Sequence, residues 1–266
     1  MSTLTDEFEG KRVVVTGISS GIGAALGKQL AGHGAHVIGL DVVEPHSGLC
    51  SEFHRCDLSD NEHILQLAAR LGDPLYALFN VAGLPGSHDP DVVMAVNVLG
   101  LRTLTSAIHP RLADGGTVVN VASGAGAGWP ENLQEIASLL DTSGFDAGLA
   151  WCREHPRTGP DAYNFSKEVV IVYSMRIAAR EFHRGVRVNT VSPGAVETPI
   201  LKDFYATMNN DTLEQLRAHA GGRNGEPDEI ASVVVFLASS AAGWVNGADI
   251  PIDGGGEVVL RLGKYA

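Results

Sequence analysis

The sequence is poor in cysteine and in basic residues. Only 3 of its 266 residues are cysteine, and none of them form a Cys-x-x-Cys pair. So few thiols, in odd number, are typical of a reducing compartment and predict a cytoplasmic protein without a disulfide framework. Lys and Arg number 19 against 31 Asp and Glu, a formal net charge of −12. Such an acidic chain repels phosphate backbones and anionic lipids, which argues against nucleic acid or a membrane surface as a partner.

Long hydrophobic runs and targeting features are also lacking. The longest apolar stretch, residues 231–245, is interrupted by serines and a glycine and is too short to cross a bilayer. The first ten residues are acidic and contain no base, so we expect no secretory signal. Cys50, His54 and Cys56 lie close in sequence, but no second cluster completes a tetrahedral metal site, and we expect no metal. With 44% hydrophobic and 19% charged residues, the chain has the composition of a folded domain.

Apolar, β-branched segments alternate with helix-like segments along the chain. We expect strands at residues 12–16, 35–40, 54–56, 75–79, 117–121, 187–191 and 249–252. We expect helices at residues 22–33, 61–71, 91–112, 162–183 and 228–238. Buried parallel strands are continuously apolar because helices cover both faces of their sheet, and the alternation implies right-handed βαβ units. The sequence therefore predicts one α/β domain over residues 1–266, with a doubly wound parallel sheet, the Rossmann fold.

Two long segments interrupt this alternation. Residues 126–158 form an insertion between the fifth strand and the following helix, with helical spacing at residues 133–140 and a second short helix at 145–154. Residues 195–224 follow the sixth strand and contain apolar residues suited to a lid, namely Ile200, Leu201, Phe204, Tyr205 and Met208. Connections this long are usually functional. Each segment is open to two interpretations, a cover over a site or ordinary packing helices.

A glycine-rich turn joins the first strand to the first helix. It has the sequence TGISSGIG over residues 16–23, and such glycines let the backbone approach a pyrophosphate bound at the helix N-terminus. Asp41 ends the second strand, where a carboxylate can accept hydrogen bonds from adenosine ribose hydroxyls and repels a 2′-phosphate. Because the neighbouring Val42 and Val43 carry no charge, this pattern predicts NAD rather than NADP. A turn without a ligand and a solvated or helix-capping acid are the alternatives.

Tyr163 and Lys167 lie four residues apart on a predicted helix, so both side chains share one face. A phenol ordinarily titrates near pH 10. An ammonium about 4 Å away is worth on the order of 4 kcal/mol at an effective dielectric of 20, enough to lower the phenol pKa toward neutrality. The pair therefore predicts a proton-transfer site. A Tyr-x-x-x-Lys pair arises by chance in many long helices, so its weight depends on the nucleotide-binding turn and on a suitably placed serine.

In this combination the sequence resembles the short-chain dehydrogenase/reductases over residues 10–256. The matching motifs occur in the family's order: TGISSGIG, Asp57 after the third strand, Asn80-Val81-Ala82-Gly83 after the fourth, Asn97 in a helix, Ser123 after the fifth, Tyr163 to Lys167 (YNFSK), and Pro193-Gly194 after the sixth. One departure is Val81, where the family has a second asparagine. The resemblance implies an oxidoreductase with a nicotinamide cofactor.

The resemblance also implies a role for each matching residue. Tyr163 would be the general acid/base, Ser123 would hydrogen-bond the reacting oxygen, and Lys167 would hold the nicotinamide ribose and lower the tyrosine pKa. Asn97 would hold a water that relays protons from Lys167. The implied cofactor-binding residues are Gly17, Ser19, Ser20, Gly21, Ile22, Gly23, Asp41, Asp57, Leu58, Asn80, Val81, Ala82, Gly83, Tyr163, Lys167, Pro193, Gly194, Val196 and Thr198. For Asn97 a helix-kinking polar residue, and for Ser123 an ordinary loop serine, remain alternatives.

Four further segments are similar to the coniferyl-alcohol dehydrogenase and 3α-hydroxysteroid dehydrogenase/carbonyl reductase branch of the family. They are AGLPGSHDP (82–90), GWPENLQ (128–134), VETPIL (196–201) and WVNGADIPIDGG (244–255). Members of that branch carry a helical insertion between the active-site serine and tyrosine. The similarity implies a bulky apolar or aromatic alcohol as substrate. Candidates for the pocket wall are Trp129, Phe145, Trp151, Phe204 and Tyr205, each of which suits the core equally well.

The sequence thus predicts an NAD-dependent oxidoreductase that interconverts a bulky alcohol and its carbonyl. A hydroxysteroid dehydrogenase/carbonyl reductase and a non-catalytic NAD-binding regulatory protein are the alternatives. An extended-type epimerase or dehydratase is disfavoured, because too few residues follow Pro193 to form a substrate domain. The resemblance also implies a homodimer or homotetramer, assembled through the helices carrying Asn97 and Tyr163 and through the last strand. The insertion lies beside the first of these surfaces, and we expect it to obstruct one interface.

Overall fold

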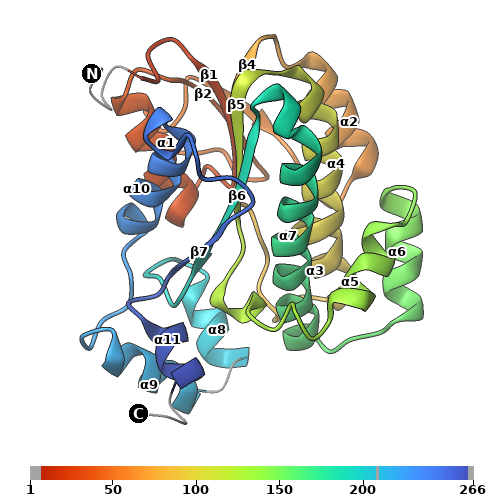
Figure 1. The fold of residues 1–266 in the computed structure, drawn as a ribbon, viewed down its shortest axis with the longest axis vertical. Helices are drawn as coiled ribbons and strands as arrows, with labels where there is room; N and C mark the ends of the chain where they lie inside the picture. Colours follow the sequence, from red (N-terminus) through yellow and green to blue (C-terminus); the bar gives the residue numbers. More distant parts are fainter. Residues whose placement is uncertain (1–6, 208–209, 263–266) are drawn as a thin grey trace.

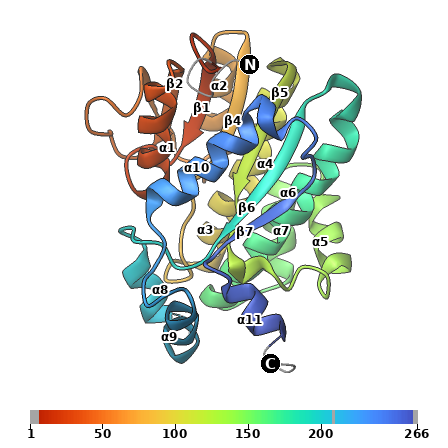
Figure 2. The same ribbon diagram turned by 60° about the vertical axis from the view of Figure 1, so that its left-hand side comes forward.

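Seven parallel strands form the centre of the molecule (Figures 1 and 2). The computed structural model describes residues 7–207 and 210–262. Within them the sheet order is β3-β2-β1-β4-β5-β6-β7, and every neighbouring pair is parallel. The strands are β1 (Arg12–Thr16), β2 (His36–Asp41), β3 (Glu52–Arg55), β4 (Leu75–Asn80), β5 (Leu112–Val121), β6 (Arg187–Pro193) and β7 (Asp249–Ile252). The predicted doubly wound α/β fold is confirmed.

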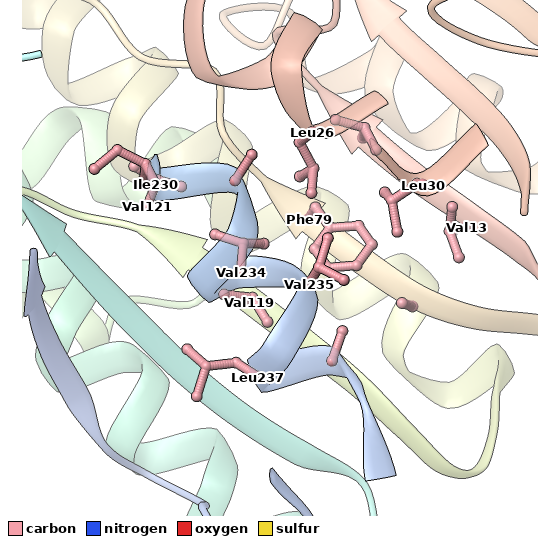
Figure 3. Close-up of a cluster of buried hydrophobic side chains, with 14 of the residues drawn as sticks. Val13, Leu26, Leu30, Phe79, Val119, Val121, Ile230, Val234, Val235 and Leu237 are labelled. Carbon is pink, nitrogen blue, oxygen red and sulfur yellow. The ribbon is translucent and has the colours of Figure 1, made fainter. Parts of the chain in front are cut away.

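Helices cover both faces of this sheet (Figure 1). One layer holds α1 (Gly21–Gly32) and α10 (Pro227–Ala238), and the other holds α2 (Asn61–Arg70), α4 (Leu101–Ile108) and α7 (Gly159–Glu181). Because side chains alternate along β1, Val13 packs with the first layer and Val14 with the second. Figure 3 shows the first contact, where Leu26 and Leu30 of α1 and Val234 of α10 close over Phe79. Each such fully buried side chain contributes about 1.5–3 kcal/mol.

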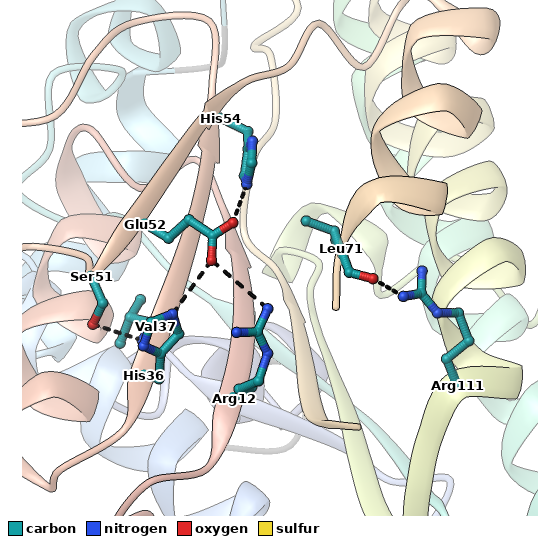
Figure 4. A network of polar contacts seen from close by, with 8 residues as sticks. All are labelled: Arg12, His36, Val37, Ser51, Glu52, His54, Leu71 and Arg111. Atoms are coloured by element: carbon teal, nitrogen blue, oxygen red, sulfur yellow. Dashed lines mark hydrogen bonds and ion pairs between the residues drawn. The ribbon is translucent and has the colours of Figure 1, made fainter. Parts of the chain in front are cut away.

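Two strands begin at least two residues before their predicted starts. β3 begins two residues earlier than expected, at Glu52, whose side chain is held on this exposed edge by Arg12, His36 and His54 (Figure 4). Polar contacts of this kind leave no hydrophobic pattern in the sequence. β5 begins at residue 112 rather than 117, because its pairing with β4 shifts between Leu75 and Ala77 across an irregular stretch that contains a positive-φ glycine.

The helix predicted at residues 91–112 is composite. α3 (Pro90–Met94) continues through a π-helical turn, η2 (Ala95–Gly100), into α4, and a 3₁₀ turn, η3 (His109–Arg111), ends it. The whole run is long and apolar enough to cross a membrane, but 72% of its most hydrophobic window is buried inside the protein. It is therefore a core helix, packed against α2, α7 and the insertion.

The insertion contains two helices, α5 (Leu133–Leu140) and α6 (Phe145–Glu154), as the spacing predicts. They pack beside α3 and α7, away from the carboxyl ends of the central strands (Figure 1). Arg102 of α4, only 9% exposed, anchors their connection by donating to the Leu139 and Gly144 carbonyls and to the Thr142 hydroxyl. For this segment the structure supports packing helices rather than a cover.

The predicted lid, residues 195–224, contains two short helices, and the C-terminal segment adds a third one beside them. α8 (Leu201–Thr207) and α9 (Asn210–His219) follow β6, and α11 (Gly256–Leu262) follows β7. Both views place them together beyond the carboxyl ends of β6 and β7 (Figures 1 and 2). Met208 lies outside the described residues. The lid therefore lies at the end of the sheet where α/β proteins bind their ligands.

Candidate active site

A cavity of about 560 Å³ opens at the carboxyl ends of the central strands. The predicted residues that line it are Gly17, Ser19, Ser20, Gly21, Ile22, Gly23, Asp41, Asp57, Leu58, Val81, Ala82, Gly83, Ser123, Tyr163, Lys167, Pro193, Gly194, Val196 and Thr198. Asn80 and Asn97 do not line it. A second cavity, of about 640 Å³, lies between residues 194–195 and helices α9 and α11, and none of the predicted catalytic side chains line it. Ser123, Tyr163 and Lys167, which are predicted to take part in the reaction, therefore line the first cavity and not the second.

The glycine-rich turn has the close contacts that a nucleotide site requires. Gly17 has φ +70°, and a Cβ added there would lie 2.9 Å from the Cα of Ala82. A Cβ at Gly23 would lie 1.9 Å from the Gly17 carbonyl oxygen. The Ser20 side chain, at the N-cap of α1, makes no capping hydrogen bond. The first N–H groups of α1 thus face the cavity without a capping side chain, which fits the pyrophosphate of a dinucleotide.

Asp41 is fixed at the edge of this cradle. Its Oδ2 accepts hydrogen bonds from the Ser19 amide (3.0 Å) and hydroxyl (2.7 Å), and its Oδ1 accepts one from the Val43 amide (3.1 Å). Arg55 lies opposite Asp41 in the β2–β3 register but donates to the Val42 carbonyl and does not line the cavity. Sequence reasoning did not consider Arg55, because strand register cannot be read from local pattern. Among the described residues that line the cavity, Lys167 is the only base.

Two residues support the loop after β4 from below: Asn80 lies beneath the cavity, and Thr16 lines it. Asn80, expected to line the ribose site, is 2% exposed and donates to the Thr105 hydroxyl (2.9 Å) and to Asn120 Oδ1 (2.7 Å). Thr16, which sequence reasoning missed, accepts from the Val81 and Ala82 amides at 2.9 and 3.0 Å. The structure therefore gives Asn80 a supporting position, because its amide is needed to pair buried polar groups beneath the loop.

Ser123, Tyr163 and Lys167 converge at the other end of the cavity. Ser123 follows β5, and its hydroxyl is close enough to the Tyr163 phenol to lower the pKa of that phenol. Tyr163 and Lys167, on one face of α7, are 6% and 5% exposed. The Lys167 ammonium lies 5.7 Å from the centre of the Tyr163 ring and donates to the Val121 carbonyl at 3.1 Å. A phenol, a hydroxyl and an amine thus share one buried space, as proton transfer to a bound oxygen requires.

Asn97 connects the π turn to helix α7. Its Oδ1 accepts from the Leu84 amide (2.7 Å), and its Nδ2 donates to the Leu84 carbonyl (3.0 Å) and to the Ser166 hydroxyl (3.1 Å). Ser166 in turn donates to the Tyr163 carbonyl at 2.7 Å. π turns are frequent at functional sites, and here the turn holds the Tyr163 helix. The implied role of Asn97 in holding a water stays a prediction.

The sequence compares closely with known proteins over nearly its full length. Residues 11–134 match a family model described as short chain dehydrogenase, and residues 152–257 match one described as enoyl-(acyl carrier protein) reductase. The coniferyl-alcohol dehydrogenase of Pseudomonas sp. (strain HR199 / DSM 7063) is 42% identical over 250 residues, covering 94% of this chain and 97% of the relative. The chain belongs to the short-chain dehydrogenase/reductase family. It is thus an NAD(P)-dependent oxidoreductase that acts on the CH–OH group of alcohols.

Two further relatives place this dehydrogenase near hydroxysteroid enzymes. The 3-alpha-hydroxysteroid dehydrogenase/carbonyl reductase of Comamonas testosteroni is 33% identical over 262 residues, covering 95% of this chain and 99% of the relative. The 3-alpha-hydroxysteroid dehydrogenase of Pseudomonas sp. B-0831, solved with NADH, has a TM-score of 0.79 and 30% identity, covering 96% of this chain and 100% of that one. The resemblance stated from the motifs is confirmed at the level of this branch.

Burial governs the protonation of Tyr163 and Lys167 in this dehydrogenase. Burial raises the pKa of Tyr163 to about 12, although the hydrogen bond with Ser123 lowers it, and burial lowers the pKa of Lys167 to about 8. The prediction that Lys167 brings the tyrosine pKa toward neutrality is wrong here. Removing both groups from water disfavours both charged forms, and burial is the largest influence on each pKa.

Of the five aromatic residues predicted for a pocket wall, the cavity is lined only by Phe204. Phe145 and Trp151 are 6% and 8% exposed and belong to the core between the insertion and α7. Trp129 packs against the same core, and Tyr205 follows Phe204 without reaching the cavity. Sequence reasoning treated the five alike, because the side on which an aromatic ring packs depends on the tertiary arrangement.

Proposed function

We propose that this dehydrogenase oxidises a bulky aromatic or allylic alcohol to its carbonyl compound with NAD. The observation that carries this proposal is the single cavity in which Asp41 lies at one end and Ser123, Tyr163 and Lys167 at the other. Asp41 is placed to accept hydrogen bonds from the ribose hydroxyls of NAD and to repel the 2′-phosphate of NADP. Cofactor choice and reaction chemistry are thereby assigned to opposite ends of one site.

The proton of the reaction is assigned to Tyr163. Its side-chain oxygen is the group that takes the proton of the alcohol as the carbonyl forms and returns it in the reverse direction. Ser123 donates a hydrogen bond to the same substrate oxygen and orients it. Lys167 holds the ribose next to the nicotinamide, and Val196 and Thr198 hold its carboxamide. The bound nicotinamide supplies the hydride chemistry.

The substrate class rests on the apolar part of the cavity and on similarity. Near Tyr163 the wall includes Leu84 and Phe204, a surface that favours an apolar or aromatic group. The 42% identity to a coniferyl-alcohol dehydrogenase supports an arylallylic alcohol. The 33% identity to a 3-alpha-hydroxysteroid dehydrogenase/carbonyl reductase supports an alicyclic alcohol as the second candidate. A purely regulatory NAD-binding protein is disfavoured, because it would not need the buried tyrosine and lysine.

A substrate screen tests this proposal. We expect cinnamyl-type alcohols to be oxidised with NAD at a kcat/KM at least about tenfold above that for hydroxysteroids, since an aryl ring suits the wall around Phe204. Parallel reactions with NAD and NADP are followed by the absorbance of the reduced nicotinamide. Preferential oxidation of hydroxysteroids would select the second candidate, and tight NADH binding without turnover of any alcohol would revive the regulatory one.

The assembly and location of the protein are proposed on separate grounds. We propose a cytoplasmic homodimer or homotetramer. Trp244, 92% exposed beside the edge strand β7, supports an interface there, because a large exposed aromatic side chain commonly marks a contact surface.

The insertion packs on α7 and is expected to obstruct assembly through that helix. Light scattering on the intact chain and on a variant lacking residues 126–158 measures this effect: equal subunit numbers would contradict obstruction. Fractionation of cells expressing the tagged chain tests the location.

A further inference from the structure

The lid helix α8 places an aromatic ring directly against the catalytic tyrosine. The ring centres of Phe204 and Tyr163 lie 5.1 Å apart, with their planes inclined by 51°. Phe204 lines the same cavity as Ser123, whereas its neighbour Tyr205 does not. Beside Phe204, Asp203 accepts a hydrogen bond from Ser87 at 3.5 Å, which joins α8 to the loop after β4. The position of Phe204 is thus set by contacts on two sides of the cavity.

This contact has two physical consequences. Tilted aromatic pairs at this separation are favourable, so the same ring face offers a packing surface to an aryl group bound next to the phenol. Because the ring packs against Tyr163, it also removes part of that side chain from water. Tyr163 is only 6% exposed, and Phe204 is one of the side chains packed with it in the same hydrophobic cluster.

We propose that Phe204 is both a specificity residue and a positioning residue for the alcohol oxidation. It forms the face on which an aromatic substrate packs, and it keeps water from the Tyr163 phenol. The first role rests on the proposed function. The second concerns Tyr163 in the protein itself and does not depend on which alcohol is the substrate.

The charges around Tyr163 leave burial as the main influence on its ionisation. Lys167 faces it from α7, Ser123 from the end of β5, and Asp203 lies beside Phe204 on α8. Asp41 lines the cavity at the end of β2, three strands away from β5. Burial raises the Tyr163 pKa to about 12. We therefore expect removal of the ring that packs against Tyr163 to lower this pKa toward the ordinary value of about 10.

Tyrosinate absorbance tests the shielding role without substrate or cofactor. Each variant is compared with its own Tyr163→Phe counterpart, so that the difference spectrum reports Tyr163 alone, and circular dichroism confirms that the fold persists at about pH 10.5. At that pH we expect clear tyrosinate from Phe204→Ala and little from the unsubstituted chain, Phe204→Leu or Tyr205→Ala. Leucine still covers the phenol, and Tyr205 never did. An unchanged Tyr163 signal in folded Phe204→Ala overturns the shielding role.

Substrate ratios test the packing role. We expect Phe204→Ala and Phe204→Leu to lower kcat/KM for cinnamyl alcohol relative to cyclohexanol by about tenfold, which corresponds to about 1.4 kcal/mol, while Tyr205→Ala keeps the ratio. An unchanged ratio in both Phe204 variants overturns this role while the proposed function stands. Failure of the unsubstituted chain to oxidise any aromatic alcohol overturns the proposed function and the packing role together, and the tyrosinate experiment still decides the shielding role.

Discussion

Replacement of Tyr163 by phenylalanine is expected to lower kcat for alcohol oxidation by about 10³-fold, equivalent to about 4 kcal/mol. The variant removes the only oxygen that we assign to proton transfer and leaves the ring in its contact with Phe204. Binding of NADH should change little, because the turn, Asp41 and Lys167 remain. The measurements are steady-state kinetics with a cinnamyl alcohol and a fluorescence titration with NADH.

The matched control for this experiment is Tyr173→Phe. Tyr173 lies on the same helix, is 9% exposed, and donates its hydroxyl hydrogen to the Arg102 carbonyl at 3.2 Å, away from the cavity. Removing this hydroxyl costs about 1 kcal/mol of stability and should leave kcat unchanged. Retained activity in Tyr163→Phe, or an equal loss in both variants, would rule out the assignment of the proton to Tyr163.

Replacement of Asp41 by asparagine is expected to shift the preference for NAD over NADP by about 10²-fold. Asparagine keeps the size of the side chain and an acceptor for Ser19 but removes the charge. A unit charge about 4 Å from a phosphate charge costs about 1–4 kcal/mol, depending on solvent access. We therefore expect kcat/KM to rise with NADP and to fall with NAD, both measured by absorbance of the reduced nicotinamide.

Glu44→Gln provides the control for a general charge effect. Glu44 is an exposed acid three residues after Asp41 and does not line the cavity, so the cofactor ratio should stay the same. If the unsubstituted chain uses NADP as well as NAD, the proposed preference is wrong. Arg55, which lies opposite Asp41 on β3, would then be the cation to test against the 2′-phosphate by replacement with glutamine.

The Tyr163→Phe and Asp41→Asn variants test two different properties of one cavity, the rate of the chemical step and the choice of cofactor. Replacing Tyr163 is expected to raise the barrier of the chemical step, and replacing Asp41 is expected to change which dinucleotide is preferred. They lie at opposite ends of the site, so their effects on ln kcat/KM should be nearly additive.

Structural features could be predicted from the sequence where the conformation of a short segment depends on the residues of that segment alone. The turn TGISSGIG needs glycine because a side chain at Gly17 or Gly23 would meet backbone. Tyr163 and Lys167 share a helix face because four residues make one turn. The helix Phe145–Glu154 ends where Pro156 forbids its continuation. Local sterics of this kind act within a few residues, so the sequence alone determined the fold class, the glycine-rich turn and the shared helix face of Tyr163 and Lys167.

Other features depended on groups far apart in the chain, and only the tertiary structure decided them. Asn80 lies beneath the cavity because it pairs with Thr105 and Asn120, and Phe204 alone among five aromatic candidates reaches Tyr163 because α8 packs over the end of the sheet. The pKa of Tyr163 rises rather than falls, because the free energy of an ionised group depends on how much water the whole fold excludes from it.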